Sequence, residues 1–206
     1  MSLVKTILEG NKIEYDDNEF EVRYSVNNDY LHYIGNGVNV TNPKGNTSCY
    51  CMFQNYKGTS IDLSNFDTHN ITDMSYMFYN CCNLKSLNLF SFNTHKVTDM
   101  EAMFYECINL KTLDISEFDT ANVMYMERMF RRCKSLKELD ISSFYIDNTK
   151  TLDDIFWDCK SLETLKVSSG CLQFFLDHKK LLFGNCGKIN IISISKLDKV
   201  VNDLFY

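Results

Sequence analysis

Proline and glycine, the residues on which tight bends most depend, are scarce in this chain. Proline occurs once among 206 residues, at Pro43, and glycine occurs eight times. Few positions therefore suit special turn conformations, and we expect regular elements to dominate the fold. The 45% hydrophobic and 23% charged residues are typical of a globular chain with a core and atypical of disorder.

Long hydrophobic runs are missing as well. No stretch approaches the ~18 apolar residues of a membrane-spanning helix, and residues 1–9 lack the apolar core and cleavage site of a signal peptide. The sequence predicts no membrane insertion and, as it stands, a cytoplasmic protein. Removal of a leader from a longer precursor would instead allow a location on the extracellular surface.

Positive charge is in deficit, with 21 Lys and Arg against 27 Asp and Glu and a net charge of −6. Phosphate backbones repel such a chain, so we expect no direct nucleic-acid binding. A protein partner with a basic surface would be complementary to it. The same net charge also serves simply to keep a small protein soluble, and both interpretations stay open.

Groups suited to catalysis are few. The chain has four histidines and neither a P-loop nor a dinucleotide-binding glycine motif. His69 and His95 are 26 residues apart and occupy equivalent loop positions in the repeat described next, but no serine or cysteine nucleophile recurs with them. We predict exposed loop roles for both histidines, no catalytic residues, no cofactor and no enzymatic activity.

The sequence does contain a repeat, and phenylalanine marks it. A phenylalanine preceded by Met, Ile or Leu recurs in steps of 25, 26, 26, 26 and 27 residues, which is the signature of a stacked array. These residues are Phe53, Phe78, Phe104, Phe130, Phe156 and Phe183. A cysteine column keeps the same phase, at Cys81, Cys107, Cys133, Cys159 and Cys186.

Each unit combines two periodicities. The pattern Met-x-x-Met-Phe-x-x-Cys, as in residues 74–81, predicts the apolar face of a short helix. The alternation Leu87-x-Leu89 predicts a short strand with Asn88 on its other face. Because one unit cannot bury both faces, we expect stacked units to share one core, with their strands ~4.8 Å apart in a continuous parallel sheet.

The pattern Leu110-x-x-Leu113-x-Ile115, which recurs in the next two units, resembles a leucine-rich repeat. Residues 61–78 further resemble the BspA-like leucine-rich repeats found in surface proteins of mycoplasmas, other bacteria and some protists. The resemblance is strong over residues 49–168 and weak over 169–195. It implies an α/β solenoid with a parallel sheet on one face and short helices on the other, and an adhesive or interaction role without an enzymatic site.

Both ends depart from the repeat. Apolar and polar residues alternate over residues 20–26, which predicts a strand, and residues 30–34 are predicted to form a second strand after a turn. Residues 174–183 predict a longer helix inside the last unit. An open solenoid needs its terminal edges covered. We predict an N-terminal capping subdomain over residues 1–48, six repeats of 25–27 residues over 49–195, and a C-terminal cap helix over 196–206.

The cysteine column should lie on the buried face, where cysteine usually behaves as a small hydrophobic residue. Stacking brings these thiols near one another, so metal or disulfide chemistry is an alternative. Cys81-Cys82 and Cys49-x-Cys51 do not have zinc-ligand spacing, however, and we predict no metal site.

Polar side chains form a column on the strand face that points away from the core. Its members are Asp62, Asn88, Asp114, Asp140 and Lys166, with Glu138 beside them. Stacked Asp114 and Asp140 repel each other unless something compensates. The column therefore predicts binding of a basic partner or a cation, and a merely solvated polar face is the alternative.

A second row follows the phenylalanines on the predicted helices. It consists of Tyr79, Tyr105, Arg131 and Trp157. These are the residue types richest in binding hot spots, so an outward row would form a partner surface. Lateral packing between neighbouring helices is the alternative.

Together these patterns predict a protein–protein interaction module. One alternative is an inhibitor from a phage or other mobile element that occludes a basic nucleic-acid-binding groove of a host enzyme, with its aspartates in place of phosphates. A surface adhesin is another.

Overall fold

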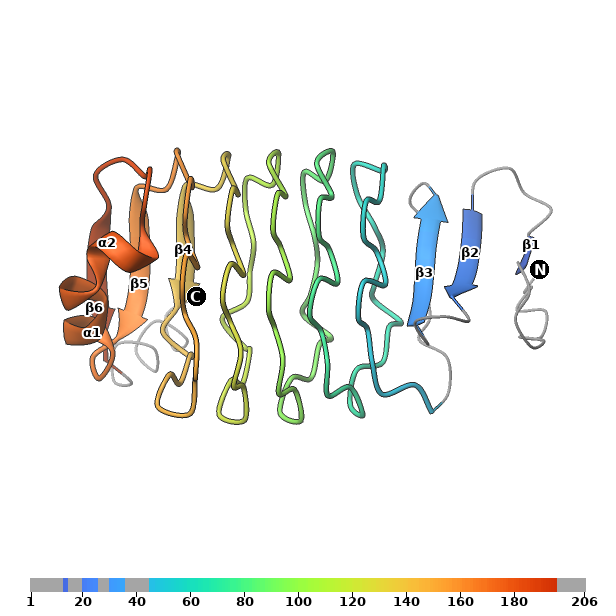
Figure 1. The fold of residues 1–206 in the computed structure, drawn as a ribbon, viewed down its shortest axis with the longest axis horizontal. Coiled ribbons are helices and arrows are strands. Elements are labelled where there is room, and N and C mark those ends of the chain that lie inside the picture. Colours follow the sequence, from blue (N-terminus) through green and yellow to red (C-terminus); the bar gives the residue numbers. More distant parts are fainter. Residues whose placement is uncertain (1–12, 15–19, 26–29, 36–44, 196–206) are drawn as a thin grey trace, which may run out of the picture.

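The computed structural model describes residues 13–14, 20–25, 30–35 and 45–195 (Figure 1). Near the N-terminus, strands pair antiparallel in the order β1 (Ile13–Glu14), β2 (Phe20–Ser25) and β3 (Tyr30–Gly35). Strands β2 and β3 agree with the two strands predicted there. The capping role of this region stays a prediction, and the predicted cap helix at 196–206 lies outside the described residues.

Residues 45–195 form a row of stacked coils, each of which contains one phenylalanine of the repeat (Figure 1). Neighbouring rings of this column lie 5.2–5.7 Å apart between centroids, and their planes differ by only 4–7°. The buried residues form a hydrophobic cluster that runs from Cys49 to Leu182. The regular phase of the phenylalanines in the sequence is thus matched by one stack of rings inside one core.

The segments predicted as short helices are not helical, and that prediction is wrong. In residues 74–81 the N–H groups of Met77, Tyr79 and Cys81 donate to carbonyls three residues earlier, which makes a chain of tight turns. Tyr76 and Asn80 have φ values of +57° and +58°, which a right-handed helix excludes. The predicted burial is nevertheless right, because successive turns return to one face at nearly the helical interval and the apolar residues of the pattern are fully buried.

Backbone hydrogen bonds between coils explain why turns replace helices. Tyr76, Phe78 and Asn80 donate their N–H groups to carbonyls of the next coil at 2.7–2.9 Å. A helix would keep these bonds inside each coil and leave the coils joined by side chains alone. Ladder bridges continue this parallel pairing along the stack, at Ser48, Asp73, Asp99, Tyr125 and Thr151. We name this side of the stack the turn face.

The scarcity of glycine predicts few special turn conformations, but the turn face contains many. Positive φ values recur at non-glycine positions in successive coils, among them Asn55, Asn80, Ala102, Glu106, Arg128, Arg132 and Asp158. Asparagine and aspartate tolerate this conformation, whereas the others pay roughly 1–2 kcal/mol each. Hydrogen bonds to the neighbouring coil offset that cost, so the stack forms its turns with few glycines.

The opposite side, the strand face, carries less regular pairing than predicted. Among the described residues, the parallel sheet comprises β4 (Glu138–Ile141), β5 (Thr164–Ser168) and β6 (Asn190–Ile194), in that order. Their register pairs Asp140 with Lys166 and Lys166 with Ile192. In earlier coils a single backbone hydrogen bond occurs at the position of these strands. An example is the Lys85 N–H, which donates to the Thr59 carbonyl at 2.8 Å. The continuous backbone ladder lies on the turn face instead.

Buried threonines join the coils at the corner that follows each strand segment, where the chain turns back toward the turn face. Thr68, Thr94 and Thr120 are at most 2% exposed. Each hydroxyl donates to a carbonyl of the next coil and accepts an N–H from the same residue, at 2.7–3.1 Å. These threonines fix the register of neighbouring coils with two hydrogen bonds apiece.

The predicted helix over residues 174–183 is divided. The structure has α1 (Leu172–Asp177) and α2 (Lys179–Leu182), separated at His178, whose φ and ψ of −103° and 20° end the first helix. Phe175 and Leu182 bury one side of this pair against the last coils.

Candidate binding surfaces

A groove of about 900 Å³ lies on the strand face. Its lining includes Asn88, Asp114, Glu138 and Asp140 of the predicted polar column, together with Lys111 and Lys137. Asp62 and Lys166, the other two predicted members, are not among its lining residues. We name this site the strand-face groove.

The aspartates of the column have a local role that the sequence reasoning missed. Asp62, Asp114 and Asp140 each accept the backbone N–H of the residue two positions later, at 2.8–3.1 Å. Asn88 accepts the Phe90 N–H in the same way at 3.0 Å. The bond from Ser64 holds the pKa of exposed Asp62 below its usual value. Recurrence of Asp or Asn directly before a strand's last residue is the signal that could have revealed these turns.

Lysines of this chain lie among the acidic residues of the strand face. Lys111 and Lys137 line the groove beside Asp114 and Asp140, and Lys166 forms an ion pair with Glu138. The hydrogen bond with Glu138 raises the pKa of Lys166. The strand-face groove is therefore of mixed charge, and its acidic residues do not form a purely negative surface.

The aromatic row packs on itself along the turn face. Tyr79 and Tyr105 stack at 4.8 Å between ring centroids with planes 16° apart. The Arg131 guanidinium lies between Tyr105 and Trp157, at 5.9 Å and 5.4 Å from their ring centroids, and it pairs with Asp154. All four side chains of the row are half-buried. This arrangement favours the lateral-packing alternative, although each side chain remains partly exposed.

Ion pairs centred on Asp158 were not foreseen. Asp158 is 7% exposed, and Arg132, Lys134 and Lys160 approach its carboxylate to 3.6–3.8 Å. Asn185 of the following coil donates to the same carboxylate. The cluster links three coils, which assigns it to holding the stack together.

The cysteine column lies inside the core, except for Cys186, which is half-buried and packs against it. The thiols of Cys81, Cys107, Cys133, Cys159 and Cys186 each lie 2.9–3.2 Å from the carbonyl oxygen of a core phenylalanine of the preceding coil and donate to it. Burial raises the pKa of Cys133 and Cys159. In residues 45–195 every cysteine is a free thiol, and no cluster of three or more potential metal ligands occurs in the described part of the chain. This placement favours packing over metal or disulfide chemistry.

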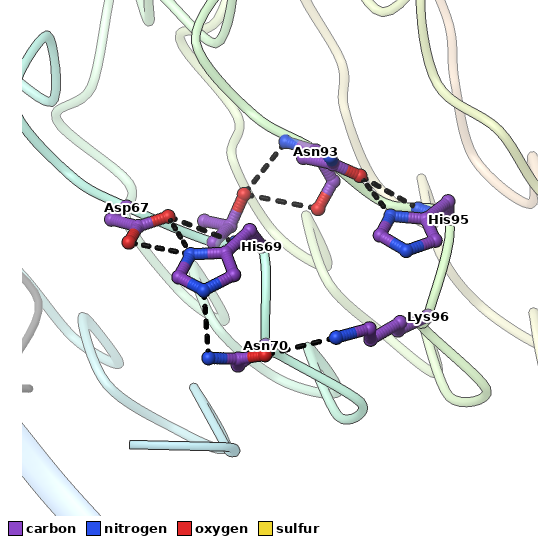
Figure 2. A network of polar contacts seen from close by, with 7 residues as sticks. Asp67, His69, Asn70, Asn93, His95 and Lys96 are labelled. Atoms are coloured by element: carbon purple, nitrogen blue, oxygen red, sulfur yellow. Dashed lines mark hydrogen bonds and ion pairs between the residues drawn. The ribbon is translucent and has the colours of Figure 1, made fainter. Parts of the chain in front are cut away.

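Figure 2 shows the loops that carry His69 and His95. His69 Nδ1 lies 2.6 Å from both carboxylate oxygens of Asp67, and its Nε2 lies 2.8 Å from Asn70 Nδ2. His95 makes the equivalent contact with Asn93 at 2.5 Å. The backbone N–H of His69 is the main cause of a lowered pKa at Asp67. Both histidines are exposed, and each is held by its own turn.

A second groove, of about 930 Å³, lies at the corner where the strand segments return. Its lining includes Ser116, Ser142, Ser143, Ser168, Ser169 and Tyr145. We name it the serine groove. The sequence reasoning did not identify it, although the replacement of the Asp-Thr pair by Tyr145-Ile146 marks the place.

Acidic side chains gather on the turn face around Asp99. The pKa of Asp99 is raised to about 6, mainly by burial and in smaller part by the charges of Asp73, Glu101 and Glu127, while a hydrogen bond from the Glu101 N–H at 2.9 Å opposes the rise. The folded state thus binds the Asp99 proton more tightly than the unfolded chain. The stability that this group contributes is complete below about pH 4 and is lost as the pH rises to about 6.

We expect Asp99→Asn to stabilise the protein at neutral pH. Asparagine keeps an oxygen for the Glu101 N–H and removes the charge, so the gain is about 1 kcal/mol near pH 7.5 after allowance for partial exposure. Near pH 4 the variant and the parent should unfold alike. Urea unfolding at the two pH values measures both. Asp62→Asn is the control, since its lowered pKa gives no gain at neutral pH; an equal gain there would contradict the assignment.

The family model described as "Mycoplasma protein of unknown function, DUF285" matches residues 47–168. The match covers more than half of the chain, which therefore belongs to this family. The comparison with curated proteins and the comparison with solved structures found no match. None of the helices in the described ranges has the length and apolar character needed to cross a membrane.

Proposed function

We propose that this chain is a protein–protein interaction module built on BspA-like leucine-rich repeats, and that the strand-face groove binds the partner. The groove itself supports this most directly. It runs across several coils, and its lining combines polar and charged side chains of both signs with Ile61, Leu87 and Leu113. A groove of this mixed character binds a protein surface through apolar contact and selects it by complementarity of charge and shape.

The fold assignment under this proposal is an α/β solenoid of leucine-rich repeats. Repeated Leu-x-x-Leu-x-Ile patterns and the shared core support it. The proposal assigns no reaction to the chain. Display on a cell surface, as an adhesin, is a form of the same function, and binding to intact cells would reveal it.

The inhibitor alternative receives less support. Charge mimicry of a nucleic acid needs a surface of one sign, and Lys111 and Lys137 lie among the aspartates of the strand-face groove. Under that alternative, capture of the partner would weaken steeply with salt and added duplex DNA would compete. The proposal expects duplex DNA to have no effect.

We expect Thr112→Arg to abolish partner capture. Thr112 is exposed in the strand-face groove, and no hydrogen bond is found for its side chain among the described residues, so arginine fills the groove without removing a turn. Immobilised protein would be incubated with cell extract and retained proteins identified by mass spectrometry. Loss of a retained protein by at least ~10-fold is the expected result.

The matched control is Gln54→Arg, which makes the same change of charge on the turn face. A protein that both variants lose equally, or that Thr112→Arg still retains, does not bind the strand-face groove and contradicts the proposal. Thermal unfolding of both variants establishes that neither has lost its fold.

A further inference from the structure

The repeat departs from its pattern where the fourth strand segment returns. A second column of buried phenylalanines, Phe66, Phe92, Phe118 and Phe144, stands at this corner. In the preceding coils the phenylalanine is followed by Asp or Asn and then by a buried threonine. Here Phe144 is followed by Tyr145 and Ile146, so the threonine ladder stops, and Tyr145 is 50% exposed. At this place the repeat lacks the stabilising hydrogen bonds of the threonine column and exposes an aromatic ring. Such a local loss of stabilising contacts is typical of a binding site.

The serine groove lies at this departure. The hydroxyl oxygens of Ser142 and Ser143 are buried and have no hydrogen-bond partner among the described residues. Leaving a buried hydroxyl without a partner is unfavourable. Both residues line the groove, and the alternative χ1 rotamers of serine give each hydroxyl other positions beside it. Ser168 and Ser169 of the next coil extend the same two columns. The groove therefore combines spare hydroxyls with an exposed aromatic face.

Charge on the lining narrows the class of ligand. Glu117, Asp119 and Asp147 line the serine groove, and its lining residues include no lysine or arginine. Anionic ligands are repelled. A cationic peptide would gain little affinity from these carboxylates, because they are exposed and exposed ion pairs contribute little. A neutral ligand rich in hydroxyl groups fits best, since its hydroxyls donate to the carboxylates, exchange hydrogen bonds with the serines and leave apolar C–H groups to pack on Tyr145.

The spacing of the coils agrees with a linear glycan. Ser116, Ser142 and Ser168 occupy equivalent positions in neighbouring coils. Parallel backbone pairing spaces such coils ~4.8 Å apart, and the ring centroids of the core phenylalanines lie 5.2–5.7 Å apart along the same direction. One pyranose ring of an extended chain advances by a similar length. We propose that the serine groove binds a linear neutral glycan along the stack, with one sugar ring packed on Tyr145 and the serines bonding successive sugars.

Affinity electrophoresis tests this directly. The purified protein would be run in native gels that contain hydroxyethylcellulose, linear β-1,3-glucan, linear mannan, xylan or galactan, and in gels without polysaccharide. We expect retardation by at least one of the five. Tyr145→Ala should weaken that retardation roughly 5-fold or more, because the stacking face is lost. Tyr145→Phe should retain it.

Two controls separate this site from the rest of the surface. Tyr125→Ala removes a partly exposed ring on the turn face, and Thr112→Arg fills the strand-face groove; both should leave retardation unchanged. Migration unaltered by all five polysaccharides overturns the proposal, as does equal retardation of wild type and Tyr145→Ala. Retention on immobilised polylysine without glycan binding would identify a cationic-peptide site instead. Failure of this test leaves partner capture by the strand-face groove untouched, since different residues line it.

Discussion

Phe104→Ala should lower the free energy of unfolding by about 3–5 kcal/mol. Phe104 is completely buried, and its ring stacks on Phe78 at 5.6 Å and on Phe130 at 5.7 Å between centroids. Removing the ring opens a cavity between two coils whose backbones are fixed by hydrogen bonds, so neighbouring rings cannot close it. Urea unfolding followed by far-ultraviolet circular dichroism measures the loss.

Phe90→Ala is the control for this prediction. Phe90 is 86% exposed, because it stands where neighbouring coils have serine, at Ser64 and Ser116. Its removal should change stability by less than ~0.5 kcal/mol. Equal losses for the two variants would mean that the column of rings does not form the core. Phe104→Leu, which leaves a smaller cavity, should fall between them if the alanine variant does not fold.

Thr120→Val should destabilise the protein by about 1–3 kcal/mol. The Thr120 hydroxyl donates to the Tyr145 carbonyl at 3.1 Å and accepts the Tyr145 N–H at 2.8 Å. Valine has nearly the same shape, fills the same buried space and leaves both backbone groups without their partner. The same unfolding experiment measures the effect.

Thr112→Val provides the matched comparison, because Thr112 is exposed on the strand face. Its substitution should leave stability within ~0.5 kcal/mol of the parent. A neutral result at Thr120 would show that the threonine column does not join the coils.

The sequence predicted which side chains are buried better than it predicted backbone conformation. Residues 74–81 show why, since a helix and a chain of tight turns both bring positions i, i+3, i+4 and i+7 to one face. What distinguishes them is the partner of each N–H group. That partner lies about 25 residues away, in the next coil, and a local pattern carries no information about it.

The sequence also predicted one of the two candidate grooves in part and did not predict the other. The polar column of the strand face followed from alternation in the strands, and Asn88, Asp114, Glu138 and Asp140 line one groove. The turn-forming role of its aspartates and the presence of Lys111 and Lys137 in the same groove depend on the three-dimensional arrangement, which spacing in the sequence does not give. The serine groove does not follow from the repeat pattern, because Tyr145 breaks that pattern.

Tight turns that contain residues of positive φ, and not helices, join the coils by backbone hydrogen bonds, and the resulting stack positions both grooves. Ala102 tests this arrangement, since its φ is +50° and its N–H donates to the Glu127 carbonyl of the next coil at 3.0 Å. Glycine relieves a strain of about 1–2 kcal/mol, and loss of the buried Ala102 methyl costs about 0.8 kcal/mol, so Ala102→Gly should leave stability unchanged or raise it by up to ~1 kcal/mol. Ala121→Gly, at a position without positive φ, should lose about 0.5–1 kcal/mol. A loss of about 1 kcal/mol or more at Ala102, as in the interior of a helix, would contradict the account.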